Sequence, residues 1–256
     1  MDKNANLPIK ILAGIAYAAM VAVNFLANSL PINNRSTGEI SDAYPNLFAP
    51  AGFTFSIWGL IYLLLAGYIL RQFSKSAQGR EELLRKINPF FIATSLANMA
   101  WIFVWHYDFI GLSVLIMAVL LALLIKIADI LRAEQMTKLE KIFISVPFSV
   151  YFGWITVAAI ANVTVFLVSI GWNRFGIDEF IWTGIILLVG ALIGVWRIRK
   201  DKNTAYGLVL IWAYFGILFK HLSASGFGGQ YPVVIASAAL SLGLFIIYTG
   251  KIFFKK

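Results

Sequence analysis

Eight runs of apolar residues, each about as long as a membrane-spanning helix, constrain this chain more than any other feature of its sequence. A helix needs about 20 apolar residues to cross the hydrocarbon core of a bilayer. The runs occupy approximately residues 9–30, 53–71, 88–106, 109–128, 142–169, 180–197, 205–221 and 231–250. Because 60% of the 256 residues are hydrophobic and only 13% are charged, a water-soluble domain could not cover this apolar surface. The sequence therefore predicts an all-α fold, a polytopic transmembrane helical bundle of about eight spans.

The positions of the basic residues predict how this bundle is oriented. With eight spans, all of the 21 Lys and Arg residues fall on one side of the membrane except Arg35, Arg174 and Lys220. Cytoplasmic loops are enriched in Lys and Arg, so both termini are expected in the cytoplasm and the chain in the cytoplasmic membrane. Because the loops account for the net charge of +9, we expect the lipid bilayer and no nucleic acid as a partner. The oligomeric state is left open, with a homo-oligomer among the alternatives.

Several kinds of chemistry are missing from the sequence. The absence of cysteine excludes disulfides and thiolate sites, and no Asp or Glu lies near the middle of any run. We therefore expect no catalytic residues, no metal ligands, no resident cofactor and no enzymatic activity. We interpret His106 and His221 as interfacial side chains at outer helix ends, and axial ligation of haem is the alternative.

Amide and aromatic side chains inside the runs predict a ligand site instead. An amide that faces lipid is costly, so each Asn should face another helix, a ligand or water. Three stripes follow helical spacing: Phe55, Trp58 and Tyr62; Asn98, Trp101 and Trp105; and Tyr151, Trp154, Ala158 and Asn162. With Asn24 they are expected at one depth in the outer half of the bundle, where rings and a few polar anchors would form a flat pocket. The alternative is that these side chains only pack the helices together.

The longest stretch expected to be non-helical is residues 31–52, between the first two spans. A connection of this length in a compact protein is usually functional or disordered, and its aromatic and proline residues argue against disorder. We interpret it as a lid over the outer mouth of the bundle.

These stripes resemble the motifs of the tryptophan-rich sensory protein family, also called the translocator protein (TspO) or peripheral benzodiazepine receptor family. The second span matches in FAPAGFTFSIWGLIYLLLAG, which contains Pro50, Phe55, Trp58 and Tyr62. The third span matches in LANMAW and the fifth in VYFGWITVAAIAN. The resemblance covers roughly residues 8–170, although Val150 stands where the family has a proline and the chain continues through three more spans. The segment SIGWNRFG, at the end of the fifth span, offers Trp172 and Arg174 but not the tyrosine that the cholesterol motif of animal members requires, which puts sterol binding in doubt.

The resemblance implies a five-helix translocator-protein-like bundle over residues 1–170 and three additional transmembrane helices packed on it over residues 171–256. It also implies binding of a flat hydrophobic ligand, such as a porphyrin or a haem-type tetrapyrrole, in sensing or transport. The expected ligand-binding residues are Asn24, Pro50, Phe55, Trp58, Tyr62, Asn98, Trp101, Trp105, Tyr151, Trp154, Ala158 and Asn162. The alternatives are a small-molecule transporter that uses all eight spans and a structural membrane protein.

Overall fold

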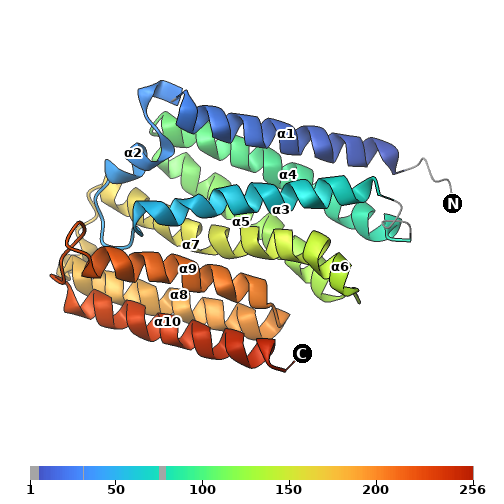
Figure 1. Cartoon of the computed structure of the whole chain (residues 1–256). Helices are drawn as coiled ribbons and strands as arrows, with labels where there is room; N and C mark the ends of the chain where they lie inside the picture. Colours follow the sequence, from blue (N-terminus) through green and yellow to red (C-terminus); the bar gives the residue numbers. More distant parts are fainter. Residues whose placement is uncertain (1–5, 31, 75–78, 256) are drawn as a thin grey trace. The chain divides into compact units, whose positions relative to one another are not determined.

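A computed structural model describes residues 6–30, 32–74 and 79–255 of the chain, and these residues contain helices and no strand. Eight helices are long and apolar enough to cross a membrane, which confirms the predicted polytopic bundle. The single helices are α1 (Leu7–Ser29), α4 (Glu81–His106), α5 (Ile110–Arg132), α8 (Glu179–Asp201), α9 (Thr204–Leu222) and α10 (Pro232–Phe253) (Figure 1). The second span joins the 3₁₀-helix η2 (Gly52–Ser56) to α3 (Ile57–Gln72). The fifth joins α6 (Lys138–Glu140), the π-helical turn η4 (Lys141–Ser145) and α7 (Val146–Ser169).

The chain divides into two compact units, which are described separately. Unit 1 contains the described residues of Met1–Ile40 and Trp58–Phe152, and unit 2 contains those of Ser41–Ile57 and Gly153–Lys256. This division follows contacts in space, whereas the expected boundary at residue 170 follows the reach of the family motifs. The assignment of residues 1–170 and 171–256 to separate domains therefore stays a prediction.

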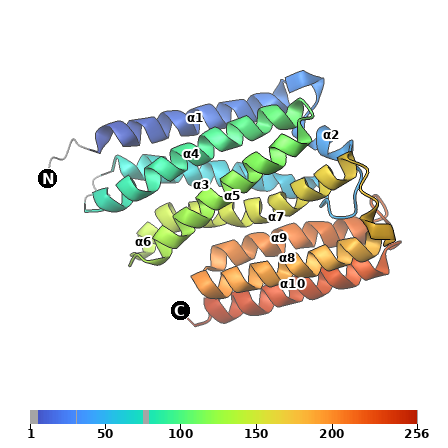
Figure 2. The ribbon, with the colours of Figure 1, turned by 180° about the vertical axis from the view of Figure 1, so that it is seen from behind.

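In unit 1, helix α4 packs along both α1 and α5, as the view from behind shows (Figure 2). Large apolar side chains remain exposed on its helices, among them Leu63, Leu70 and Leu115 with exposed fractions of 70%, 72% and 64%. Surfaces of this kind are unfavourable in water and normal against acyl chains. The exposed faces therefore agree with lipid as the solvent of the spans.

In unit 2, α10 packs along both α8 and α9 (Figure 1). Glycines allow these helices to approach closely, as small residues do in membrane helix packing. A Cβ atom added at Gly207 of α9 would overlap Oγ1 of Thr249 on α10 and lie 3.1 Å from both its Cβ and Cγ2. Because Thr249 is 4% exposed and β-branched, its side chain has little freedom to move away.

The connection between the first two spans contains helical structure, so the expectation of a wholly non-helical stretch at residues 31–52 was wrong. It contains the 3₁₀-helix η1 (Ile32–Asn34) and the short helix α2 (Thr37–Asp42). Ser36 and Glu39 form a reciprocal capping box, with Ser36 N donating to Glu39 Oε2 at 2.6 Å and Glu39 N donating to Ser36 Oγ at 3.3 Å. The backbone N–H of Ser36 holds the pKa of the Glu39 carboxyl below its usual range, which keeps this cap ionised.

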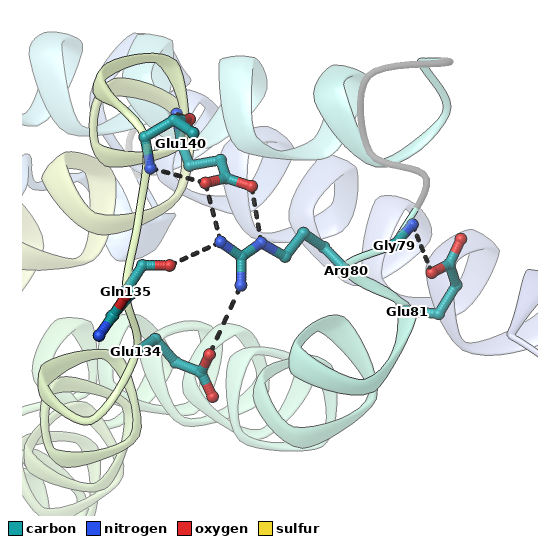
Figure 3. Close-up of polar contacts among 7 residues, drawn as sticks. Gly79, Arg80, Glu81, Glu134, Gln135 and Glu140 are labelled. Carbon is teal, nitrogen blue, oxygen red and sulfur yellow. Dashed lines mark hydrogen bonds and ion pairs between the residues drawn. The ribbon is translucent and has the colours of Figure 1, made fainter.

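At the opposite end of unit 1, an arginine ties the start of α4 to α6 and to the connection that precedes α6 (Figure 3). Arg80 binds Glu140 through two hydrogen bonds, from Nε at 2.6 Å and from Nη2 at 2.9 Å, and Nη2 also donates to the Gln135 carbonyl at 2.6 Å. Glu134 lies 3.6 Å from Nη1. Bidentate arginine–carboxylate pairs fix geometry as well as charge, so this contact fixes the start of α4 relative to α6.

The close approach of α9 and α10 gives a test of the packing in unit 2. We expect Gly207→Ala to lower the free energy of unfolding by about 1–3 kcal/mol, because the new methyl group overlaps the Thr249 side chain. Thermal unfolding in detergent would measure this change, and Gly207→Ala combined with Thr249→Ala should recover most of the loss. Gly243→Ala is the matched control, since a Cβ atom at Gly243 would meet no atom within 4 Å. Equal effects of the two single substitutions would contradict this account of the packing.

Candidate ligand-binding site

A chain of buried amides links three helices of unit 1. Asn24 Nδ2 of α1 donates to the Met20 carbonyl at 2.9 Å and to Asn98 Oδ1 of α4 at 2.6 Å. Asn98 Nδ2 then donates to the Tyr151 hydroxyl of α7 at 3.2 Å. Asn24, Asn98 and Tyr151 are at most 5% exposed, so the chain lies inside the unit, as the expectation that each amide faces a partner requires.

The Met20 carbonyl of the backbone determines which groups donate and which accept in these hydrogen bonds. A carbonyl oxygen only accepts, so the atom of Asn24 beside the Met20 carbonyl must be the amide nitrogen. That nitrogen also faces Asn98, so Asn98 must present its oxygen to Asn24 and its nitrogen to Tyr151. Tyr151 therefore accepts from Asn98, and its own hydroxyl hydrogen is directed to no acceptor among the residues that the structure describes. The buried Tyr151 hydroxyl of unit 1 can therefore donate a hydrogen bond to a ligand.

Aromatic rings of α3 lie beside this phenol. The rings of Trp58 and Tyr62 are stacked, with centroids 5.7 Å apart and an angle of 23° between their planes. Trp58 also meets Tyr151 at a centroid distance of 6.0 Å and an angle of 64°. Both α3 rings are half-buried, and the Tyr17 hydroxyl of α1 donates to the Tyr62 carbonyl at 2.9 Å. The structure therefore brings Asn24, Trp58, Tyr62, Asn98 and Tyr151 together.

The remaining candidate residues of unit 1, Trp101 and Trp105, stack on each other with centroids 5.1 Å apart. Trp105 is 4% exposed, and its indole N–H donates to the Thr37 carbonyl at 3.2 Å. His106 Nδ1 donates to the Ile102 carbonyl at 2.7 Å, because a carbonyl can only accept. Trp105 and His106 therefore support the local structure where the first part of the 31–52 connection meets the end of α4.

Unit 2 holds the other five candidate residues. Phe55 meets Trp154 edge to face, with centroids 5.7 Å apart and an angle of 85° between the rings. Pro50 is buried, Ala158 is half-buried, and Asn162 is 3% exposed. The structure thus pairs Phe55 with Trp154 inside this unit.

The second part of the 31–52 connection is fastened to α8 and α9, which the sequence did not reveal. On α9, Trp212 Nε1 donates to the Thr54 carbonyl at 2.9 Å and His221 Nε2 donates to the Leu47 carbonyl at 2.8 Å. Glu179 at the start of α8 accepts from the Leu47 amide at 3.1 Å. The Ala51 amide donates to the Gly216 carbonyl at 3.1 Å, and the Phe53 ring contacts those of Trp212, Phe215 and Phe219. Helices of the last three spans therefore hold the segment that carries Pro50 and Phe55.

A comparison with known protein families agrees with these motifs. A family model described as TSPO-like protein matches residues 10–250. The chain belongs to the TSPO-like protein family. The match includes α8, α9 and α10, and so extends beyond the five spans that carry the recognised motifs. No curated protein and no solved structure matches the chain.

This TSPO-like protein has a second buried polar cluster, which sequence reasoning missed. The Tyr68 hydroxyl of α3 donates to Asn88 Oδ1 of α4 at 2.7 Å, and Asn88 Nδ2 donates to Gln72 Oε1 at 2.8 Å. All three residues are at most 2% exposed. The signal was present, because Asn88 begins one predicted span and Gln72 directly follows another, and amides at such positions need partners.

The attachment of residues 41–57 to α9 predicts a measurable effect of Trp212. We expect Trp212→Phe to speed hydrogen exchange of the Ala51 and Thr54 amides about fivefold, since it removes one hydrogen bond while keeping a ring beside Phe53. Exchange followed by mass spectrometry in detergent would measure this. Trp196→Phe is the control, because Trp196 is 56% exposed on α8 and its ring lies over Arg197 and Lys200 instead. Unchanged exchange in Trp212→Phe would show that this bond does not hold the segment.

Proposed function

We propose that this multi-pass membrane protein of TSPO type binds a flat hydrophobic ligand of the porphyrin or haem type and acts in its sensing or transport. The observation that carries the proposal is the Tyr151 hydroxyl, a buried donor that lies next to the Trp58 and Tyr62 rings. The proposal assigns no catalytic step to the chain.

The chemistry of this cluster selects a class of ligand. Indole and phenol rings offer flat apolar faces, which favour a planar conjugated molecule. A buried donor that is left without an acceptor costs free energy, so a ligand with a carboxylate, carbonyl or ring nitrogen is favoured over a hydrocarbon. Tetrapyrroles combine a flat apolar ring with such acceptors.

The proposed site residues in unit 1 are Asn24, Trp58, Tyr62, Asn98, Trp101, Trp105 and Tyr151. In this division of roles, Trp58 and Tyr62 contact the ligand face and Tyr151 donates to its acceptor. Asn24 and Asn98 fix the direction of the Tyr151 donor. For unit 2, family membership supports Pro50, Phe55, Trp154, Ala158 and Asn162 as further ligand-binding residues.

Titration of the purified protein with protoporphyrin, followed by quenching of tryptophan fluorescence, tests the proposal. We expect Tyr151→Phe to weaken binding about fivefold, the equivalent of one hydrogen bond of about 1 kcal/mol. We expect Trp58→Leu to weaken it more strongly, because a ring contact is lost as well.

Tyr214→Phe is the matched control for the loss of a buried hydroxyl. Tyr214 is 1% exposed, and its hydroxyl donates to the Leu187 carbonyl inside unit 2 at 3.0 Å. Its removal should lower stability and leave the affinity for protoporphyrin unchanged. If Trp58→Leu, Trp101→Leu and Trp154→Leu all bind like the wild type, the site assignment fails. If the wild type binds no protoporphyrin, the proposed ligand class is wrong.

We also propose that both termini lie in the cytoplasm, on the support of the basic loops. Because the chain contains no cysteine, single cysteines can report on sidedness. Ala43 and Ala133 are both exposed and lie in connections that the orientation places on opposite sides. We expect a membrane-impermeant maleimide to label Ala43→Cys in intact cells and Ala133→Cys only after permeabilisation. The reverse pattern would show the opposite orientation.

A further inference from the structure

One end of unit 2, where α8 and α10 finish and α9 begins, is strongly basic. Its described cations are Arg197, Arg199, Lys200, Lys202, Lys251 and Lys255. Asp201 is the only acidic residue within 195–205 and 245–255. It pairs with Arg197 at 2.7 Å in a contact whose two side chains are 4% and 7% exposed. The other five cations are exposed, and the described residues offer none of them an ion pair.

These charges converge from two helices. Arg199 of α8 and Lys251 of α10 both approach the ring of Tyr248, with Cζ 5.8 Å and Nζ 5.3 Å from its centroid. Lys200 Nζ lies 4.7 Å from the Trp196 ring. An aromatic ring attracts a cation through its quadrupole but carries no net charge. The mutual repulsion of the cations therefore remains, and an anion between them would remove it.

Several cations of unit 1, by contrast, are paired with acids of the same unit. Arg80 is paired with Glu140 and Glu134, as Figure 3 shows. Lys86 pairs with Glu82 at 2.8 Å, and Arg132 pairs with Asp129 at 3.1 Å. The basic end of unit 2 has no such acid in its described part beyond Asp201, so an anion of another molecule could approach its five exposed cations.

We infer that the surface formed by Arg199, Lys251 and Tyr248, with Trp196 and Lys200 beside it, binds the phosphate headgroup of an anionic phospholipid. Tryptophan and tyrosine rings near helix ends are enriched at headgroup depth, and Trp196 is 56% exposed here. Arginine and lysine are the usual partners of a phosphate oxygen. A lipid phosphate is held at this depth by its acyl chains, which a free phosphate lacks. The anion is therefore a lipid of the surrounding leaflet.

Native mass spectrometry of the full chain in detergent, with phosphatidylglycerol or phosphatidylcholine of equal acyl chains added, tests this inference. The wild type should retain more phosphatidylglycerol than phosphatidylcholine, and inorganic phosphate should not displace the bound phosphatidylglycerol. A cation near an anionic lipid surface contributes about fivefold in affinity, so Arg199→Gln with Lys251→Gln should weaken phosphatidylglycerol binding about 25-fold. Arg199→Lys with Lys251→Arg keeps the charge and should keep the preference.

The matched control removes two exposed cations from unit 1, Lys126→Gln with Lys141→Gln, for which the described residues provide no ion pair. It makes the same change in net charge and should leave binding of phosphatidylglycerol unchanged. If the control weakens binding as much as the Arg199 and Lys251 pair, only overall charge matters and the inference is overturned. Equal retention of the two lipids by the wild type, or displacement by inorganic phosphate, overturns it as well.

Discussion

Within a bilayer, a polar group that lacks a partner inside the protein is costly, and this constraint shapes the spans of the structure. Helices satisfy the backbone of the spans, which explains why the described residues form no strand. The amides follow the same rule, because Asn24 and Asn98 pair across helices, as do Asn88 and Gln72. The polar side chains of unit 1 are thus few, buried and connected, and they fix how α1, α3, α4 and α7 meet.

The same requirement produces the candidate site. The Met20 carbonyl orients the Asn24 amide, and this determines the donor and acceptor in the hydrogen bonds from Asn24 to Asn98 and from Asn98 to Tyr151. The Tyr151 hydroxyl accepts in the last of these bonds and keeps its own hydrogen to donate. The hydrogen bonds that pack these helices together thus leave one buried hydroxyl free to donate, and the proposed function rests on it. The rings of Trp58 and Tyr62 next to it make the position suitable for a flat ligand with an acceptor.

At the helix ends, where water and headgroups are available, the two units differ. Unit 1 pairs several of its cations with acids, as Arg80 does with Glu140, whereas at the basic end of unit 2 only Arg197 has an acidic partner among the described residues. Away from this end, Glu179 at the start of α8, and Trp212 and His221 in the middle and last turn of α9, hold the segment that carries Pro50 and Phe55. The last three spans therefore form one compact unit with this segment, and the family match includes them.

The sequence by itself determined the eight spans, because length and hydropathy are properties of one segment at a time. It also determined which side chains share a stripe, because helical periodicity is local, and the family, because three motifs keep their spacing. The capping box of Ser36 and Glu39 was equally readable, although it was overlooked. Only the tertiary structure decided that Asn24 meets Asn98, 74 residues away, and that Trp212 holds Thr54. Periodicity gives the face of a helix, whereas its rotation and its depth against a neighbour depend on how both surfaces pack.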